Sequence, residues 1–522
     1  MEFRQHKLTI KIRTYYLTLF LLNVSLTLVS SNSKSQTVEI SIDPSHRHQT
    51  IENFGASDAW SFQFLGQWPE EKKQAIADLL FSSDTTVAGQ PKGIGLSLWR
   101  YNLGAGSAEQ GANSGIVDEW RRAPSFLNED GTYDWNKKPG QTWFLNAAKI
   151  RGVNQFLGFF NSPPVALTKN GKAFSSDGKS NIEINKYSDF SKYIAETIKG
   201  IQQNTGILLN YISPVNEPQW DWKDGGQEGN PYTNEQIFSL VTSLNEKLES
   251  EKLTTKIIVP EAAQLEYLIA EKDKPNRDNQ IAAFFDPRSA NYIGDLNHVS
   301  KHIDGHSYFT TSPYAKSVAL RKQLKAEVAS ANISYWMSEY CILGDNKGEI
   351  NGNGRDLGIN SALYMAKVIH SDLVNANATS WQWWTAVSAY NYKDGLIYID
   401  KNKTDGNFYQ SKMLWGLGNF SWFIKPGFHR IEAFSPWLSE KDTLLLVSAY
   451  QNKTNNNLVV VVINSDVKPI TVHLNIKNTS IQQLKTYITS ATQNLKPGVK
   501  ADNNGFYTIP ARSIVTLTGN TN

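Results

Sequence analysis

The stretch Ile212-Ser213-Pro214-Val215-Asn216-Glu217-Pro218 decides the fold that we expect for this chain. A short apolar run ends in Asn-Glu, and a proline follows at once. Because the residue before a proline is excluded from helical space, we expect Glu217 in extended geometry at the end of a strand. Strand ends are where α/β barrels place their chemistry, so this carboxylate calls for a partner. The best candidate is Glu339, in Tyr335-Trp336-Met337-Ser338-Glu339-Tyr340.

Eight short apolar runs alternate with segments whose apolar residues recur at i, i+3 and i+4. The runs cover residues 50–56, 93–101, 155–160, 208–215, 256–260, 303–308, 334–339 and 379–384, and the helical segments include 187–203, 235–251, 315–329 and 360–375. Repeated strand–helix alternation predicts a parallel sheet with helices outside it. Eight such units close into a (β/α)8 TIM barrel, here over residues 50–417. This span exceeds the ~250 residues typical of the fold, so its loops must be long.

The pattern changes at about residue 418. Short strands at 444–450, 458–464, 470–476, 484–490 and 505–517 are separated by turn-rich pieces, without a long helical pattern. This spacing predicts an antiparallel β-sandwich over residues 418–522. The early strand in residues 36–49 precedes the barrel and is expected to join the sandwich, which both ends of the chain would then build. No Pro- or Ser-rich linker separates the domains, so we expect them to pack rigidly together.

Residues 1–35 have the pattern of an export signal. Arg4, Lys7, Lys11 and Arg13 precede an apolar run at 15–29, and residues 30–35 are small and polar, as in a cleavage region. The apolar run is too short for a comfortable membrane span, although a signal anchor is the alternative. We therefore expect an exported protein, periplasmic or extracellular, with no membrane span in the mature chain.

Composition excludes several classes of function. A net charge of +3 argues against an electrostatically driven nucleic-acid binder. The 15 Trp and 22 Tyr suit stacking platforms for sugars, although large cores also use aromatic residues. Cys341 is the only cysteine, so no disulfide and no cysteine-based zinc or iron–sulfur site can form within the chain. No HExxH or other metal-ligand cluster is visible, and we expect a monomer without metal or cofactor.

The two carboxylates have a chemical use together. On the fourth and seventh strands, Glu217 and Glu339 would both point into the cup at the C-terminal face of the barrel. Glycoside hydrolysis needs two carboxyl groups that flank one bond, one to protonate the leaving oxygen and one to attack or to activate water. Two carboxyls this close cannot both ionise freely, so the pKa of one must rise and make it the acid.

The chain resembles glycoside hydrolase family 30, of the retaining clan of (β/α)8 glycosidases, over nearly the whole mature chain. The resemblance rests on five motifs in order: Asn53-Phe54-Gly55-Ala56-Ser57, Leu98-Trp99-Arg100-Tyr101-Asn102, Ser162-Pro163-Pro164, Asn216-Glu217-Pro218 and Ser338-Glu339-Tyr340. The terminal sandwich also resembles that family. Asn161 stands where members often carry Trp, and Ser57-Asp58-Ala59-Trp60 looks closer to the branch that contains endo-β-1,6-galactanases.

The resemblance implies that Glu217 is the acid/base and Glu339 the nucleophile of a retaining mechanism. It also implies that Asn216 donates to the sugar 2-hydroxyl and that Arg100 holds Glu339 ionised. A turn-capping role for Asn216 and a purely structural ion pair for Arg100 are the alternatives.

Further substrate contacts are expected from strand ends and loops. His306 is a candidate for binding a sugar hydroxyl, with a buried structural histidine as the alternative, and Tyr308 for steadying the nucleophile. Trp383 is our choice over Trp384 for the floor under the sugar, because it alternates with Trp381. Glu261 is expected to contact sugar hydroxyls, or else to be solvated or to cap a helix.

Long loops at 104–143, 220–232 and 344–355 should rim the cleft, and we assign a substrate contact there to Trp220. Trp60 and Asn161, which follow the first and third strands, are further candidates for substrate contacts. The alternative is that each tryptophan anchors its loop.

Three functions remain: a retaining β-glycosidase, a non-catalytic carbohydrate-binding protein on the same scaffold, and a barrel hydrolase of other bonds. The last would need a nucleophilic elbow or a metal site, and neither is visible. For the first, endo-β-1,6-galactanase is our best interpretation by branch resemblance. A β-1,6-glucanase, a glucuronoxylanase and an exo-acting β-fucosidase or β-xylosidase remain open.

Overall fold

A computed structural model describes residues 37–438, 443–452, 454, 456–478, 484–498 and 505–520. The predicted signal segment lies outside these residues. Among the described residues, no helix is long and apolar enough to cross a membrane.

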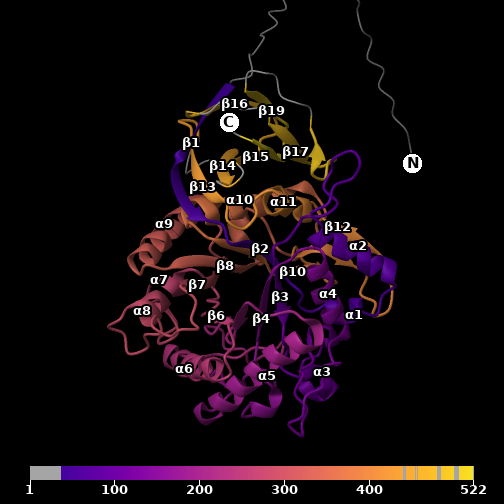
Figure 1. The fold of residues 1–522 in the computed structure, drawn as a ribbon, viewed down its shortest axis with the longest axis vertical. Coiled ribbons are helices and arrows are strands. Elements are labelled where there is room, and N and C mark those ends of the chain that lie inside the picture. Colours follow the sequence, from indigo (N-terminus) through magenta and orange to yellow (C-terminus); the bar gives the residue numbers. More distant parts are fainter. Residues whose placement is uncertain are drawn as a thin grey trace, which may run out of the picture. The chain divides into compact units, whose positions relative to one another are not determined.

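Eight parallel strands form the barrel (Figure 1). They are β2 (Asn53–Ser57), β3 (Leu98–Asn102), β4 (Gln155–Phe159), β5 (Tyr211–Ser213), β6 (Lys256–Ile257), β7 (His302–His306), β8 (Ser334–Tyr340) and β9 (Ser380–Trp383). The order is β6-β5-β4-β3-β2-β9-β8-β7, and parallel bridges from Ile257 to Val299 and from Ala262 to Gly305 join the two ends. The strand–helix alternation in the sequence is thereby confirmed as a closed barrel.

Helices follow each strand and cover the outside of the barrel. They are α1 (Phe62–Leu65), α2 (Glu70–Phe81), α3 (Ser107–Gln110), α4 (Pro139–Ile150), α5 (Tyr187–Thr205), α6 (Asn234–Ser250), α7 (Glu266–Ile269), α8 (Gln280–Phe285), α9 (Tyr314–Ser330), α10 (Ile359–Asn375) and α11 (Lys412–Ser421). Local signals explain some boundaries. A capping box between Thr233 and Gln236 starts α6, and Gly206 ends α5 in the left-handed conformation.

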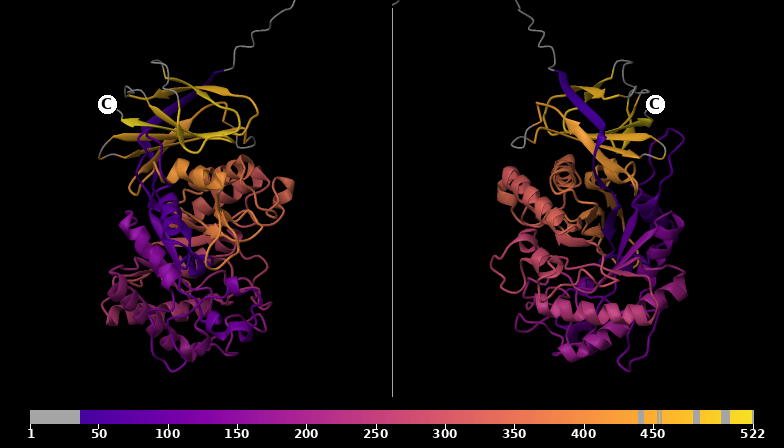
Figure 2. Two further views of the ribbon diagram at one scale, coloured as in Figure 1. Left: turned by 90° about the vertical axis from the view of Figure 1, so that its right-hand side faces the viewer. Right: turned by 60° about the vertical axis from the view of Figure 1, so that its left-hand side comes forward.

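A nine-stranded sheet forms the second domain (Figure 2). Its strands are β1 (Thr37–Thr50), β13 (His429–Phe434), β14 (Leu445–Asn452), β15 (Asn457–Asn464), β16 (Ile470–Ile476), β17 (Lys485–Thr489), β18 (Lys496–Pro497), β19 (Phe506–Ile509) and β20 (Ser513–Asn520). The early strand joins this domain as expected. Its pairing with β16 is parallel, however, whereas every other pair among these strands is antiparallel.

The two faces of this sheet pack in different directions. The side chains of one face pack against one another and form the sandwich core, which includes Val38, Ile40, Val460 and Leu517. The other face places Tyr450 and its neighbours in the core shared with the barrel, against α10 and α11. A small sheet of β10 (Thr385–Ser388), β11 (Gly395–Ile399) and β12 (Phe408–Gln410) follows the last barrel strand and was not expected.

Candidate active site

Glu217 and Glu339 lie close together at the C-terminal ends of the barrel strands. Glu339 is in β8, and Glu217 follows β5 by four residues. Three atoms lie within 4.8 Å of one another: one carboxylate oxygen of each glutamate and a ring nitrogen of His306. Both side chains are almost fully buried, since the two residues are 7% and 4% exposed.

The backbone at Glu217 differs from the expected extended geometry. Its φ is +45°, in the left-handed region. A following proline disfavours the right-handed helical region, but it does not choose between the conformations that remain. The left-handed conformation costs a non-glycine residue about 1–2 kcal/mol, and here the fold holds it in place. The Glu217 N–H donates to the carbonyl oxygen of Glu261 at 2.9 Å, and Trp222 Nε1 donates to the Glu217 carbonyl oxygen at 3.0 Å.

Glu339 accepts hydrogen bonds on both carboxylate oxygens. Arg100 Nη1 donates to Oε2, and the Tyr308 hydroxyl donates to Oε1 at 3.0 Å. Arg100 is fully buried, with its guanidinium carbon 3.8 Å from the centre of the Phe159 ring. Its Nη2 donates to Asn216 Oδ1 at 3.2 Å, which fixes the orientation of the amide beside Glu339. These charge-assisted bonds favour a carboxylate held in one orientation.

His306 connects Glu217 to a third buried carboxylate. Its Nδ1 lies 2.9 Å from Glu217 Oε1, and its Nε2 lies 3.0 Å from Glu261 Oε2. Burial lowers the pKa of His306, but Glu339, Glu217 and Glu261 outweigh burial and raise the pKa to about 10. The ring is therefore an imidazolium that donates through both nitrogens.

Glu261 is an internal counter-ion, which corrects our expectation that it meets sugar or solvent. The residue is fully buried, and besides His306 it accepts from Arg100 Nη2 at 3.2 Å and from Ser338 Oγ at 2.5 Å. Burial raises the pKa of Glu261, but the Arg100 and His306 charges outweigh it and hold the pKa at about 2.

Charge balance identifies which carboxyl holds the proton. The cluster has two cations, Arg100 and His306, and three acids, Glu217, Glu261 and Glu339. Two of the acids balance the two cations, so the third is most stable when protonated. Burial raises the pKa of Glu217, and the neighbouring Glu339 charge adds to this rise. Both the charge balance and the direction of this shift favour Glu217 as the protonated member of the cluster.

A cleft of about 440 Å³ lies over the two glutamates. This volume is in the range typical of ligand sites. Its aromatic walls are Trp60, Trp220, Trp222, Phe309, Trp384 and Tyr392. Of the expected contact residues, Asn216, Tyr308, Trp60 and Trp220 line this cleft.

Of the two neighbouring tryptophans at the end of β9, the one that lines the cleft is not the one that we expected. Trp384 lines the cleft, 5.2 Å from the Trp60 ring in an edge-on arrangement. Trp383 is fully buried, and its Nε1 donates to the carbonyl oxygen of Asp394. We had chosen Trp383 because it lies on the same side of the strand as Trp381. Trp381, however, faces the helix layer, where its Nε1 donates to Asp372 of α10 at 2.9 Å. Alternation therefore puts Trp383 in the core as well, and Trp384 is the tryptophan that faces the cleft.

Asn161 and the tryptophans of the 104–143 loop are not among the residues that line the cleft. Asn161 is 2% exposed, and neither polar atom of its amide has a hydrogen-bond partner among the described residues. Trp120 is buried, and Trp135 stacks on Tyr133 with ring centres 5.3 Å apart. Here the loop-anchoring alternative holds.

Two residues of the cleft wall each have a buried polar atom without a partner. Trp60 Nε1 and Asp394 Oδ1 are buried and have no hydrogen-bond partner in the described part of the chain. Asp394 had no sequence signal, because it stands in the loop between β10 and β11 with no motif around it. A donor and an acceptor of this kind are suited to a sugar hydroxyl, which both accepts and donates.

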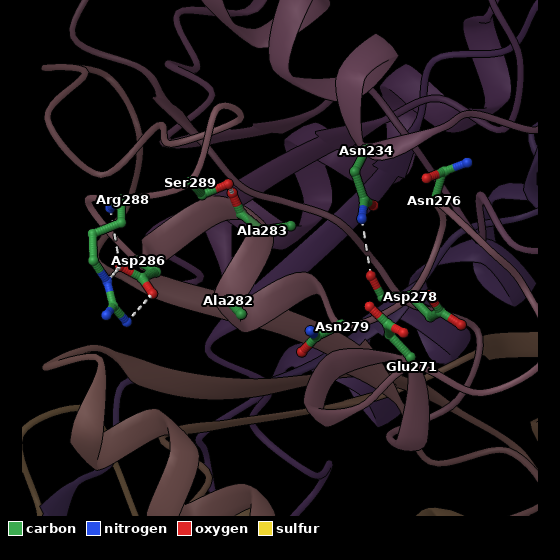
Figure 3. A pocket seen from close by; sticks show the side chains of 10 residues that line it. All are labelled: Asn234, Glu271, Asn276, Asp278, Asn279, Ala282, Ala283, Asp286, Arg288 and Ser289. Atoms are coloured by element: carbon green, nitrogen blue, oxygen red, sulfur yellow. Dashed lines mark hydrogen bonds and ion pairs between the residues drawn. The ribbon is translucent and has the colours of Figure 1, made fainter.

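A second hollow, of about 490 Å³, lies between α6 and α8 (Figure 3). Three of its charged side chains already have hydrogen-bond partners. Arg288 contacts Asp286 at 2.7 Å, and Asp278 accepts from the backbone of Lys272 at 2.8 Å. It contains neither of the catalytic candidates.

Comparison with known proteins assigns the class. Residues 37–398 match the model of O-glycosyl hydrolase family 30, and residues 438–517 match the family 30 β-sandwich domain. The chain therefore belongs to glycoside hydrolase family 30, as the five motifs indicated, and it is a glycoside hydrolase.

Individual relatives are more distant. The chain is 24% identical to an endo-β-1,6-galactanase of Hypocrea rufa over 73% of each chain. It is also 24% identical to a glucuronoxylanase of Bacillus subtilis, over 69% of this chain and 72% of the relative. The crystal structure of a conserved exported protein from Bacteroides fragilis superposes with a TM-score of 0.86 at 33% identity, over 92% of this chain and 100% of that one.

Proposed function

We propose that the protein is a retaining β-glycosidase that works by double displacement, with Glu217 as acid/base and Glu339 as nucleophile. The observation that carries this proposal is the short distance between the two carboxylates, whose nearest oxygens are within 4.8 Å. Retaining enzymes hold their carboxyl groups about 5–5.5 Å apart, whereas inverting enzymes need about 6.5–9.5 Å to admit a water.

The neighbours of each glutamate support its role. Glu217 forms a hydrogen bond with His306 through one carboxyl oxygen, and it lines the cleft. It therefore protonates the leaving oxygen and later activates water from the same position. Glu339, oriented by Arg100 and Tyr308, attacks the anomeric carbon. Asn216 donates its amide to the sugar 2-hydroxyl, since its oxygen is held by Arg100.

Our leading substrate is β-1,6-galactan, cleaved internally. A relative named endo-β-1,6-galactanase supports it, as does the resemblance of the Trp60 segment. Trp384 and Trp220 supply flat apolar surfaces for sugar rings, and Trp60 Nε1 and Asp394 Oδ1 supply hydrogen bonds to hydroxyls.

A glucuronate-bearing xylan is the second candidate, because of Arg121. This arginine lines the cleft, lies 5.5 Å from the Trp60 ring and forms no ion pair within the described ranges. Its guanidinium is a suitable partner for the carboxylate of a uronic acid branch.

The decisive experiment compares the wild type with Glu339→Gln on β-1,6-galactan, β-1,6-glucan and glucuronoxylan, with sizing of the products. We expect oligosaccharides of several lengths from β-1,6-galactan and a loss of activity in the variant. Sugar release that the substitution leaves unchanged would remove the assignment of Glu339. Cleavage of glucuronoxylan alone would show that glucuronoxylan, not β-1,6-galactan, is the substrate, and it would leave the proposed mechanism unchanged. A protein that binds these polymers without cutting them would be the non-catalytic alternative.

We also propose that the protein is exported. The basic and apolar pattern of residues 1–35 supports this, together with the similarity to a conserved exported protein from Bacteroides fragilis. Mass spectrometry of the secreted chain tests it, and retention of residues 1–35 in a membrane fraction would favour a signal anchor.

A further inference from the structure

Three potential metal ligands meet on the β-sandwich, away from the catalytic residues. His46 and His48 are in β1, and Glu432 is in the neighbouring strand β13. His46 Nδ1, His48 Nε2 and a carboxylate oxygen of Glu432 lie within 4.8 Å of one another. We propose that these three side chains form a binding site for a divalent cation that prefers imidazole ligands, with Zn²⁺ as the first choice.

The spacing of the two histidines suits one ion. Residues i and i+2 of an extended strand point to the same side, and the two rings do stack, with centres 4.9 Å apart. The antiparallel partner strand then brings the third ligand across. Sequence reading could not find this set, because His48 and Glu432 are 384 residues apart.

The distances are close to those of a tetrahedral zinc ion. With metal–ligand distances of about 2.0–2.1 Å, the ligand atoms of such an ion lie about 3.3 Å from one another. Glu432 Oε2 is 2.8 Å from His48 Nε2 and 4.0 Å from His46 Nδ1, on either side of that value. Two imidazoles and one carboxylate are also the ligand set of several zinc sites that keep a fourth position for water.

Exposure allows the site to load and adjust. The His46 side chain is 63% exposed and Glu432 is 36% exposed, so both can move by the small amount required. His48 is more enclosed, at 14%. Two cationic side chains, Arg430 and Lys325, lie near His48. Those two cations also repel a metal ion, so affinity depends on all three ligands acting together.

The site lies where the backbone pairing of the two strands is irregular. The register between β1 and β13 is irregular between Asp43 and Arg47 and again between Arg47 and Thr50. A metal ion held by both strands would fasten this interrupted part of the ladder. The expected role is therefore structural, separate from glycoside hydrolysis.

The test titrates the full-length protein with ZnCl₂ at pH 7.5 by calorimetry, alongside thermal unfolding. We expect one zinc ion per chain and a higher melting temperature in its presence. His46→Gln and Glu432→Gln should each weaken binding by more than about tenfold, because losing even an outer partner of a ligand costs about 10–100-fold. His46 is exposed, so its substitution leaves the metal-free fold unchanged.

The matched control is His473→Gln. His473 pairs with Glu39 on the same sheet and belongs to no three-ligand cluster among the described residues, so its loss should leave zinc binding as in the wild type. Binding that survives both His46→Gln and Glu432→Gln would place the ion elsewhere and overturn the proposal. The absence of binding to the wild type would overturn it as well.

Discussion

The buried ion pair between Arg321 and Asp372 offers a sharp test of how the helix layer supports the catalytic strands. Arg321 of α9 and Asp372 of α10 are both fully buried. Asp372 accepts from Arg321 Nε at 2.6 Å, from Ser307 Oγ at 3.1 Å and from Trp381 Nε1 at 2.9 Å. Ser307 stands between the two strand-end residues that contact the glutamates. The perturbation is Asp372→Asn, which keeps the side-chain shape and removes the charge.

The magnitude follows from these contacts. Three donors converge on Asp372, and an asparagine offers them only one oxygen, with an NH₂ group facing a donor. The substitution also leaves the Arg321 charge buried without a counter-ion. Breaking a buried pair in this way costs about 3–5 kcal/mol, a large part of the ~5–15 kcal/mol that holds a typical fold.

Urea unfolding followed by tryptophan fluorescence measures the loss. Asp189→Asn is the control, because its pair with Lys186 is about half exposed and contributes roughly 0–1 kcal/mol. The double substitution Arg321→Met with Asp372→Leu should recover part of the loss, since it removes the uncompensated charge of Arg321 but leaves Trp381 Nε1 without an acceptor. A loss in Asp372→Asn no larger than that of the control would refute the reasoning.

Three further predictions concern the cleft. Burial raises the pKa of Glu217 above its ordinary 4.5, so ionising this group costs folding free energy as the pH rises above that value. Glu217→Gln should therefore melt at a higher temperature than the wild type at pH 7, with a difference that shrinks below pH 4; a constant difference would contradict this. Trp384→Ala should raise KM and leave the fold intact, whereas Trp383→Ala should lower the free energy of unfolding by about 3–5 kcal/mol, and the opposite pattern would restore the original choice. Trp60→Phe keeps an aromatic ring but removes Nε1, so KM should rise about two- to tenfold with unchanged stability, and an unchanged KM would show that no substrate hydroxyl uses this donor.

Features that depend on local pattern were predictable from the sequence. Each barrel strand is a short apolar run, and each long helix carries its own i, i+3, i+4 spacing, so the eight-fold alternation and the fold followed from neighbouring residues. The motif order likewise located Glu217 and Glu339 at strand ends. What the pre-proline rule could not supply was the left-handed backbone at Glu217, because it excludes one conformation without selecting another.

Features that depend on distant contacts were not predictable. The charge of Glu261 was visible, but its burial follows from Arg100 and His306, which are 161 and 45 residues away. The direction of Trp383 follows from the contact between Trp381 and a helix. The parallel pairing of β1 follows from a partner near the other end of the chain.

That pairing also bears on how the chain reaches its native state. Glu39 of β1 lies opposite His473 of β16, 434 residues further on. Contacts of such high sequence separation form late, because a long loop must close before they contribute. The barrel can therefore assemble while β1 still lacks its neighbour. During that interval the unpaired edge of β1 is open to another chain, so the yield of refolding should fall with protein concentration.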